Sequence, residues 1–163
     1  RTRSSSRATS TSRAFRRSFE SLAGIVAFTA EFFARAGIDA SLRPAVDLAL
    51  EELFTNMVKH GRASGADVDI ALTAIREGVE VTLTDHGVAA FDVTRAPDAD
   101  VTLPIEQRRP GGLGLHLVRR LLDAIEYDYA EESRRSRITF RKTLAERPGA
   151  GATEAAGGEG AGD

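Results

Sequence analysis

The order of the hydrophobic periodicities along the chain is the feature that most constrains its fold. Apolar residues recur with helical spacing over residues 20–36 and again over 42–60. Strand-like alternation follows over residues 67–75 and 79–85. A chain that places two helices before most of its strands favours an α+β two-layer sandwich over a parallel βαβ sheet.

The remaining segments complete this pattern. A short first strand is expected over residues 14–19, a third helix over 114–124, and closing strands over 125–130 and 137–144. Residues 86–111 contain three of the five prolines and little periodicity, so we expect a long loop there. A loop of this length inside a compact domain is usually functional.

Residues at the expected helix ends support these boundaries. Gly37 is a natural stop for the first helix, because glycine readily adopts the left-handed conformation that ends helices. Ser41 is expected to cap the second helix, and Pro44 falls in its first turn. Gly61 is expected to end that helix.

Composition divides the chain and excludes several classes of protein. A basic arm (1–13) and a Gly/Ala/Glu-rich tail (146–163) are expected to be disordered around one domain at 14–145. The absence of cysteine excludes disulfides and thiol chemistry. No apolar run is long enough for a membrane helix and no signal peptide is visible, so we expect a cytoplasmic location and no membrane partner. The arginines of the arm favour a solvated terminus over direct nucleic-acid binding.

The second helix carries a polar stripe. Glu52, Asn56 and His60 are each four residues apart, which places them on one helix face. Such a stripe is commonly just a solvated face. The alternative is a metal–phosphate site, in which the amide oxygen of Asn56 ligates Mg²⁺ and the Glu52 carboxylate polarises an attacking hydroxyl.

Two glycine-containing segments extend this hypothesis. Asp85 ends an otherwise apolar strand, where a carboxylate can accept a hydrogen bond from an exocyclic amine such as that of adenine, and Gly87 permits close approach to a flat ring. A plain Asp-x-Gly turn is the alternative. Further on, glycines open directly into an apolar helix over residues 110–118, and exposed backbone N–H groups at a helix start bind anions. This segment is neither a P-loop nor a dinucleotide-binding fingerprint.

The order of these segments is more specific than any one of them. Glu-x-x-x-Asn, Asp-x-Gly and Gly-Gly-Leu-Gly-Leu together resemble the ATP-binding boxes of the GHKL ATPases. The run GGLGLHLVRRLLDAIEY resembles the anti-sigma-factor serine kinases of the histidine-kinase-like class. The resemblance covers about residues 14–144. It implies a Bergerat fold, in which helices cover one face of a mixed, mostly antiparallel sheet and ATP lies between sheet, helices and a lid.

The resemblance also implies roles for individual residues. Glu52 would be the general base, and Asp85 would recognise adenine. The lid would span residues 92–111 and carry a phosphate-neutralising arginine. Ala89 stands where many relatives have a second glycine, which we interpret as the mark of a subgroup. The implied nucleotide-binding set is Asn56 (also the metal ligand), Lys59, His60, Asp85, Gly87, Ala89, Arg108, Arg109, Gly112, Leu113, Gly114, Leu115 and Ser136.

The implied function is an ATP-dependent, Mg²⁺-requiring protein serine/threonine kinase. Its implied substrate is an anti-anti-sigma (STAS-like) protein, and many members of the family also bind a sigma factor. Two alternatives stay open from the sequence: a non-catalytic, ATP-gated binding module, and the ATPase domain of a larger multidomain signalling protein. A homodimer is compatible with the sequence as well.

Overall fold

The computed structural model describes residues 8–95, 102, 104 and 112–145. Its five strands form one sheet in the order β1-β2-β3-β5-β4, and every pairing among them is antiparallel. The strands alternate with turns and helices along the chain in the order that the periodicities predict. Their bounds are β1 Ser10–Phe15, β2 Val68–Ile75, β3 Gly78–His86, β4 Ala124–Ala130 and β5 Arg135–Thr143.

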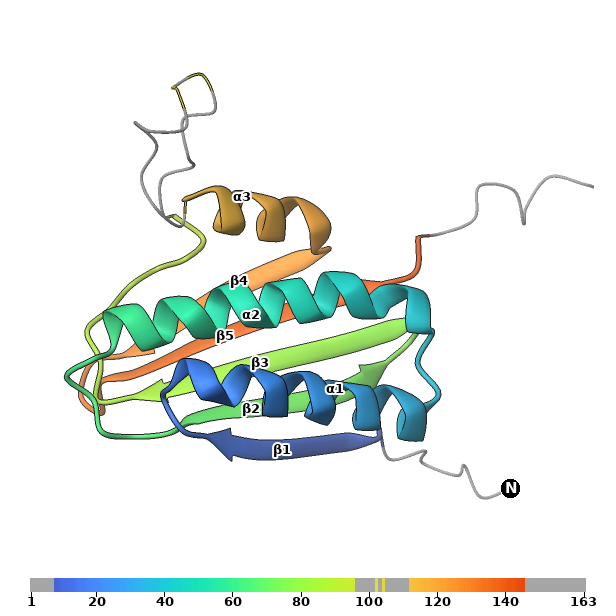
Figure 1. The fold of residues 1–163 in the computed structure, drawn as a ribbon, viewed down its shortest axis with the longest axis horizontal. Coiled ribbons are helices and arrows are strands. Elements are labelled where there is room, and N and C mark those ends of the chain that lie inside the picture. Colours follow the sequence, from blue (N-terminus) through green and yellow to red (C-terminus); the bar gives the residue numbers. More distant parts are fainter. Residues whose placement is uncertain (1–7, 96–101, 103, 105–111, 146–163) are drawn as a thin grey trace, which may run out of the picture.

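Three α-helices lie over one face of this sheet, which gives the predicted two-layer α+β sandwich (Figure 1). Two of them are preceded by a short 3₁₀ turn. The helices are α1 Leu22–Ala36, α2 Arg43–His60 and α3 Gly112–Leu121, and the 3₁₀ turns are η1 Phe19–Ser21 and η2 Ala40–Leu42.

The hydrophobic core lies between the two layers. Alternate residues of the central strands point toward the helices, because side chains of a strand alternate between its two faces. Val81 and Leu83 of β3 are fully buried, as are Leu53 and Phe54 of α2. Asp85 continues the inward-facing series of β3, so the strand directs a carboxylate into the layer between sheet and helices.

The helix ends confirm part of the prediction and correct one residue. Gly37 caps α1 in the left-handed conformation, with φ 65°, and Gly61 follows the last residue of α2. Ser41, however, is not the N-cap of α2, because it lies inside the 3₁₀ turn η2 that precedes the helix. The Asp39 carboxylate accepts a hydrogen bond from the Ser41 backbone N–H and caps that turn, and hydrogen bonding to Ser41 holds the pKa of Asp39 below its ordinary value.

Two strand expectations are also corrected. The first strand begins at Ser10, four residues earlier than predicted, so the last residues of the expected arm 1–13 belong to the sheet. Only Phe15 of β1 is buried, so this edge strand gives no alternating pattern in the sequence. The sheet expected to be mixed is antiparallel throughout the described part of the chain.

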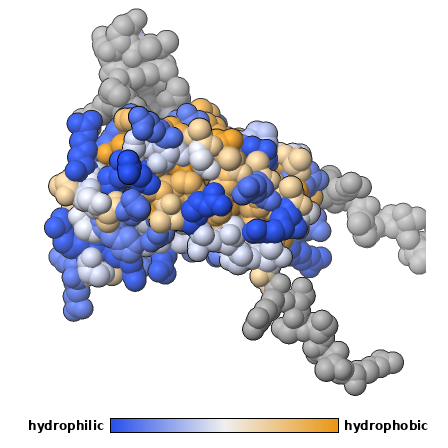
Figure 2. Space-filling view, turned by 60° about the horizontal axis from the view of Figure 1, so that its bottom comes forward, coloured by the Kyte–Doolittle hydropathy of each residue, from blue (hydrophilic) through white to orange (hydrophobic). Residues whose placement is uncertain are grey.

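The surface over the α1 and α2 side presents an apolar band between hydrophilic regions (Figure 2). A shallow groove between these two helices is lined by Leu22, Ala23, Ile25, Val26, Asp47, Leu50 and Glu51. Within the described ranges, the helices are all too short or too polar to cross a membrane. Most of the expected lid 92–111 lies outside the described residues.

Candidate functional site

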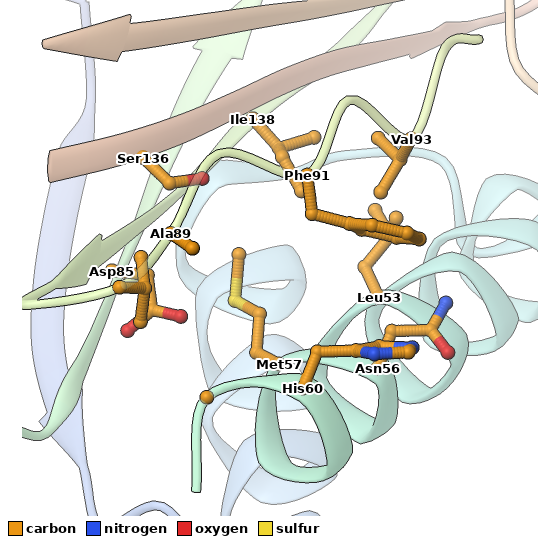
Figure 3. Close-up of a pocket in the computed structure, with 12 residues that line it drawn as sticks. Leu53, Asn56, Met57, His60, Asp85, Ala89, Phe91, Val93, Ser136 and Ile138 are labelled. Carbon is orange, nitrogen blue, oxygen red and sulfur yellow. The ribbon is translucent and has the colours of Figure 1, made fainter. Parts of the chain in front are cut away.

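A pocket opens between α2, the end of β3 and the start of β5 (Figure 3). Its volume is about 380 Å³, including the part that is open to solvent. In Figure 3, Asp85 and Ser136 lie at one end and Asn56 and His60 at the other. The lining residues are Leu53, Asn56, Met57, His60, Gly61, Asp85, Val88, Ala89, Phe91, Val93, Ser136 and Ile138.

The end of the pocket formed by the strands contains a buried ion pair. Asp85 is 3% exposed and lies opposite Ser136 in the register of β3 and β5. Its carboxylate is bound by the guanidinium of Arg17, which comes from the link between β1 and η1. The Asp85 Oδ1 atom also accepts a hydrogen bond from the His86 backbone N–H at 3.0 Å.

The segment that follows β3 forms one wall of the pocket and is fixed by β4 and α3. The Tyr129 hydroxyl donates to the Val88 carbonyl at 2.8 Å, and the Phe91 N–H donates to the Tyr127 hydroxyl at 2.9 Å. The Arg119 guanidinium donates to the carbonyl of Val93 at 2.6 Å. These contacts hold the backbone around the lining residues in place.

The helix α2 supplies the other end of the pocket. Asn56 is buried, and its amide nitrogen Nδ2 has no hydrogen-bond partner. One turn further on, the His60 ring stacks on Phe91, with 4.6 Å between the ring centroids and 19° between the ring planes. An orphaned buried amide in a native structure calls for an explanation, and a missing ligand is one of the explanations that fit.

One turn before Asn56, Glu52 lies directly against the first turn of α3. A Cβ atom added to Gly114 would overlap the Glu52 carboxylate, so the close approach of the two groups requires glycine at position 114. Within the described part of the chain, Glu52 forms no ion pair. The carboxylate therefore lies beside the start of α3, and the N-terminus of a helix favours anions.

A profile of the histidine kinase-like ATPase domain family matches residues 15–142, which is most of the chain. The chain belongs to this family. An ATPase domain of this kind implies ATP as its ligand, so the pocket next to α2 is a candidate nucleotide site.

Two curated relatives align with more than half of the chain. The chain is 32% identical over 90 residues to the serine/threonine-protein kinase BtrW of Bordetella bronchiseptica, covering 54% of this chain and 63% of BtrW. It is 33% identical over 103 residues to the serine-protein kinase RsbW of Listeria monocytogenes serovar 1/2a, covering 60% of this chain and 65% of RsbW. The chain thus spans between about half and two thirds of the length of the curated relatives that it matches.

A solved structure supports the fold of this histidine kinase-like domain. The crystal structure of the RsbU and RsbW domains of Rv1364c from Mycobacterium tuberculosis superposes with a TM-score of 0.58 at 15% identity. The match covers 83% of this chain and 32% of that one. At this identity the likeness concerns the fold alone.

The structure of this ATPase domain brings together only part of the predicted residues. Asn56, His60, Asp85, Ala89 and Ser136 line one pocket, and Glu52 lies one helical turn away from it. The other predicted residues differ in their positions.

Those other residues fall into three groups. Lys59 is exposed and does not line the pocket, and Gly87, with φ 68°, is not among the lining residues either. The Leu115 side chain is buried in the hydrophobic core, so only its backbone is available to a ligand. Gly112 and Leu113 begin α3, whereas Arg108 and Arg109 lie outside the described residues.

Sequence reasoning missed several residues of the site. Arg17 was assigned to the first strand, and the sequence carries no local signal that it contacts Asp85, 68 residues away. Phe91, Tyr127 and Tyr129 were also missed. The tyrosines carry a weak signal, because an alternating strand that presents two phenols two residues apart directs both hydroxyls to the same side.

Proposed function

We propose that this domain is an ATP-dependent protein serine/threonine kinase that phosphorylates an anti-anti-sigma (STAS-like) partner and thereby controls a sigma factor. Family membership and relatives named as serine-protein kinases support the proposal. The observation that carries it is the spacing on α2: a buried amide with a free N–H faces the pocket, and a carboxylate one turn away lies against the start of α3. ATP is the proposed phosphoryl donor, and a kinase that uses ATP works where ATP is present. The proposal therefore includes a cytoplasmic location.

In this proposal the strand end of the pocket binds the base. Asp85 accepts a hydrogen bond from the exocyclic amine of adenine, and Ser136, opposite it in the sheet, supports the same edge. Gly87 and Ala89 belong to the backbone segment that runs along the ring. A buried carboxylate that already has a counter-ion meets this role without the cost of an unpaired charge.

The helix end of the pocket binds the phosphates. Asn56 is the proposed Mg²⁺ ligand through its amide oxygen, because an amide carbonyl is a hard oxygen donor. Its Nδ2 atom, which has no partner in the described part of the chain, is left to donate to a phosphate oxygen. Bound Mg²⁺ would offset negative charge on the phosphates. Gly112 and Gly114 would present backbone N–H groups at the start of α3, where the helix dipole favours anions. A lid arginine, Arg108 or Arg109, completes the proposed set.

Glu52 is the proposed general base. The serine or threonine hydroxyl oxygen of the partner attacks the γ-phosphorus of ATP, a new O–P bond forms, and the bond from phosphorus to the β,γ-bridging oxygen breaks. The hydroxyl proton passes to the Glu52 carboxylate, and the products are the phosphorylated partner and ADP. The assignment rests on position, because Glu52 lies one helical turn from the proposed metal ligand Asn56 and forms no ion pair in the described part of the chain.

The test is phosphoryl transfer by the purified chain with labelled ATP, Mg²⁺ and candidate single-domain STAS-like partners. Glu52→Gln keeps the size of the side chain but cannot accept a proton, so we expect transfer to fall by roughly two to four orders of magnitude while ATP binding is retained. The matched control is Glu51→Gln, the exposed neighbour on the same helix, which should transfer phosphate at the wild-type rate.

Two outcomes would contradict the proposal. Transfer at the wild-type rate by Glu52→Gln would exclude Glu52 as the base. A wild-type chain that binds a partner in an ATP-dependent way but never phosphorylates it would be a non-catalytic, ATP-gated binding module.

A further inference from the structure

Arg17 contacts a residue of the pocket, Asp85, and neither the motifs nor the proposed roles account for it. It lies between β1 and η1, yet its side chain is only 7% exposed and reaches the strand end of the pocket. Its Nη1 atom donates to Asp85 Oδ2 at 3.1 Å and to the Met57 carbonyl at 2.9 Å, and its Nη2 atom binds Asp85 Oδ1. One guanidinium thus joins the end of β3 to the last turn of α2.

The hydrogen bonds of Asp85 leave one acceptor position in the pocket. Each carboxylate oxygen has about two lone-pair sites. Both sites of Oδ1 are taken, by Arg17 Nη2 and by the His86 backbone N–H. Oδ2 accepts only from Arg17 Nη1 among the described contacts, so one of its sites is open to a donor in the pocket.

The structure keeps Arg17 in this place at a cost. Its Nε atom is buried without a hydrogen-bond partner, which is unfavourable for a charged group. The path of the side chain also requires glycine at position 61, because a Cβ there would overlap Arg17 Nη1. The backbone of Gly61, with φ −96°, is one that any residue can adopt, so the local reasons for a glycine are the close approaches of Arg17 and of the Met57 carbonyl oxygen.

We propose that Arg17 is a positioning residue that makes the pocket selective for a purine carrying an exocyclic amine. A bidentate guanidinium fixes the plane of the Asp85 carboxylate and keeps it an acceptor on both oxygens. The open site on Oδ2 then accepts an N–H and repels a carbonyl oxygen. This inference rests on the proposed nucleotide site and names the residue that sets its base specificity.

The same contact has an opposite interpretation, in which Arg17 competes with the base for Asp85 and must leave before a nucleotide binds. The open site on Oδ2 favours positioning over competition. The two interpretations predict different results when Arg17 is removed. If Arg17 competes with the base, the affinity for ATP rises; if it positions Asp85, the preference for a base with an amine falls.

The experiment compares ATP with inosine triphosphate, which carries a carbonyl oxygen in place of the amine, by calorimetric titration of the whole chain. The wild type should prefer ATP by at least about 100-fold, as expected of a site built to bind an N–H. Arg17→Ala should lower that preference by about tenfold or more, and Arg17→Lys, which keeps the charge but loses the fork, should fall between the two. The ratio of the two affinities does not depend on how much of a weakened variant is folded.

Gly61→Ala provides a second, independent route to the same change, because the new Cβ displaces the Arg17 guanidinium. The new Cβ would also lie 2.8 Å from the Met57 carbonyl oxygen, so the helix end has to shift as well. The double variant Arg17→Ala/Gly61→Ala separates the two effects. If Gly61→Ala acts on the ATP preference through Arg17, the double variant should show the same preference as Arg17→Ala alone. Gly65→Ala, where a Cβ meets nothing within 4 Å, is the matched control and should keep the wild-type preference.

Equal losses for ATP and inosine triphosphate in Arg17→Ala would overturn the inference and leave Arg17 a purely structural role. A rise in ATP affinity in that variant would overturn it in favour of competition. Both results leave nucleotide binding by the wild type intact, whereas a wild-type chain that binds neither nucleotide would refute the proposed function itself.

Discussion

The two ends of the pocket differ in how their polar groups are satisfied. At the strand end, Asp85 is buried and held by Arg17 and by a backbone N–H. At the helix end, the Asn56 amide nitrogen is buried without a partner, and Glu52 lies against a helix start without an ion pair among the described residues. At the strand end the protein therefore balances the charge of Asp85 and leaves one acceptor site on Oδ2, whereas at the helix end the Asn56 donor has no partner at all in the described part of the chain.

Because the two ends differ in this way, we expect substitutions at the strand end to change mainly the stability of the fold and those at the helix end to change mainly phosphoryl transfer. A buried charge whose partner is removed costs several kcal/mol, so the loss of one partner at the strand end should lower the free energy of unfolding whether or not a nucleotide is bound. Polar groups that await a ligand contribute little to folding and can even weaken it. Substitutions at the two ends should accordingly be detected by different measurements.

The largest expected effect is on the free energy of unfolding. Arg17→Ala leaves the Asp85 carboxylate buried without its counter-ion and should destabilise the fold by about 3–5 kcal/mol. Glu52→Gln at the other end should change the stability by no more than about 0.5 kcal/mol. Urea unfolding of both variants without nucleotide measures this. Equal destabilisation by the two would show that the ends do not differ as described.

The next effect concerns the dependence of ATP affinity on Mg²⁺. Asn56→Ala removes the proposed metal ligand, so affinity should fall by about 100-fold with Mg²⁺ and change little without it. Asp85→Asn presents a donor to the adenine amine, so affinity should fall by a similar factor with and without Mg²⁺. Each variant is titrated with ATP in the presence and in the absence of Mg²⁺. The ratio of its two affinities does not depend on its folded fraction, because that fraction is the same in both titrations.

If the loss of ATP affinity depended on Mg²⁺ in the same way in Asn56→Ala and Asp85→Asn, the base and the phosphates could not be assigned to opposite ends of the pocket. A reversed assignment, with the affinity of Asp85→Asn sensitive to Mg²⁺ and that of Asn56→Ala insensitive to it, would place the phosphates beside the strands instead.

Much of the helix end could be predicted from the sequence, because its signals are local. Glu52, Asn56 and His60 share one face of a helix through their four-residue spacing, and the structure keeps them on α2. The same periodicity gave the two long helices, and alternation gave β2 and β3. Spacing within a single element is enough for predictions of this kind.

The strand end depends on contacts that spacing does not encode. Arg17 meets Asp85 across 68 positions, and the pairing of β1 with β2 and of β2 with β3 brings the two near each other. The early start of β1 has the same origin, since an edge strand with one buried residue takes its register from its neighbour. Ser41 is not the cap of α2 because Asp39, two residues before it, begins the 3₁₀ turn η2, and Ser41 lies inside this turn.

A smaller effect sharpens the account of the helix end. Gly114→Ala places a Cβ on the Glu52 carboxylate and should displace it, so phosphoryl transfer should fall by about tenfold while ATP affinity changes only slightly. Gly24→Ala is the matched control, because a Cβ there meets the Phe15 ring at an ordinary 3.6 Å within α1. That control should transfer normally and gain up to about 1 kcal/mol in stability. Unchanged transfer by Gly114→Ala would mean that the position of Glu52 does not matter to the reaction.

The smallest effect concerns the two tyrosines of β4 that fix the wall between the ends. Tyr129→Phe removes a part-buried hydrogen bond to the Val88 carbonyl, next to the base end, and should cost about 1 kcal/mol of stability. Tyr127→Phe removes a hydrogen bond from the Phe91 N–H in an exposed setting, where water replaces the hydroxyl, so its cost should be about 0.5 kcal/mol or less. Thermal unfolding of both variants gives the order. A larger loss of stability in Tyr127→Phe than in Tyr129→Phe would contradict this order. It would mean that the protein fixes the wall more firmly at Phe91, which stacks on His60 at the helix end, than at Val88 near the strand end.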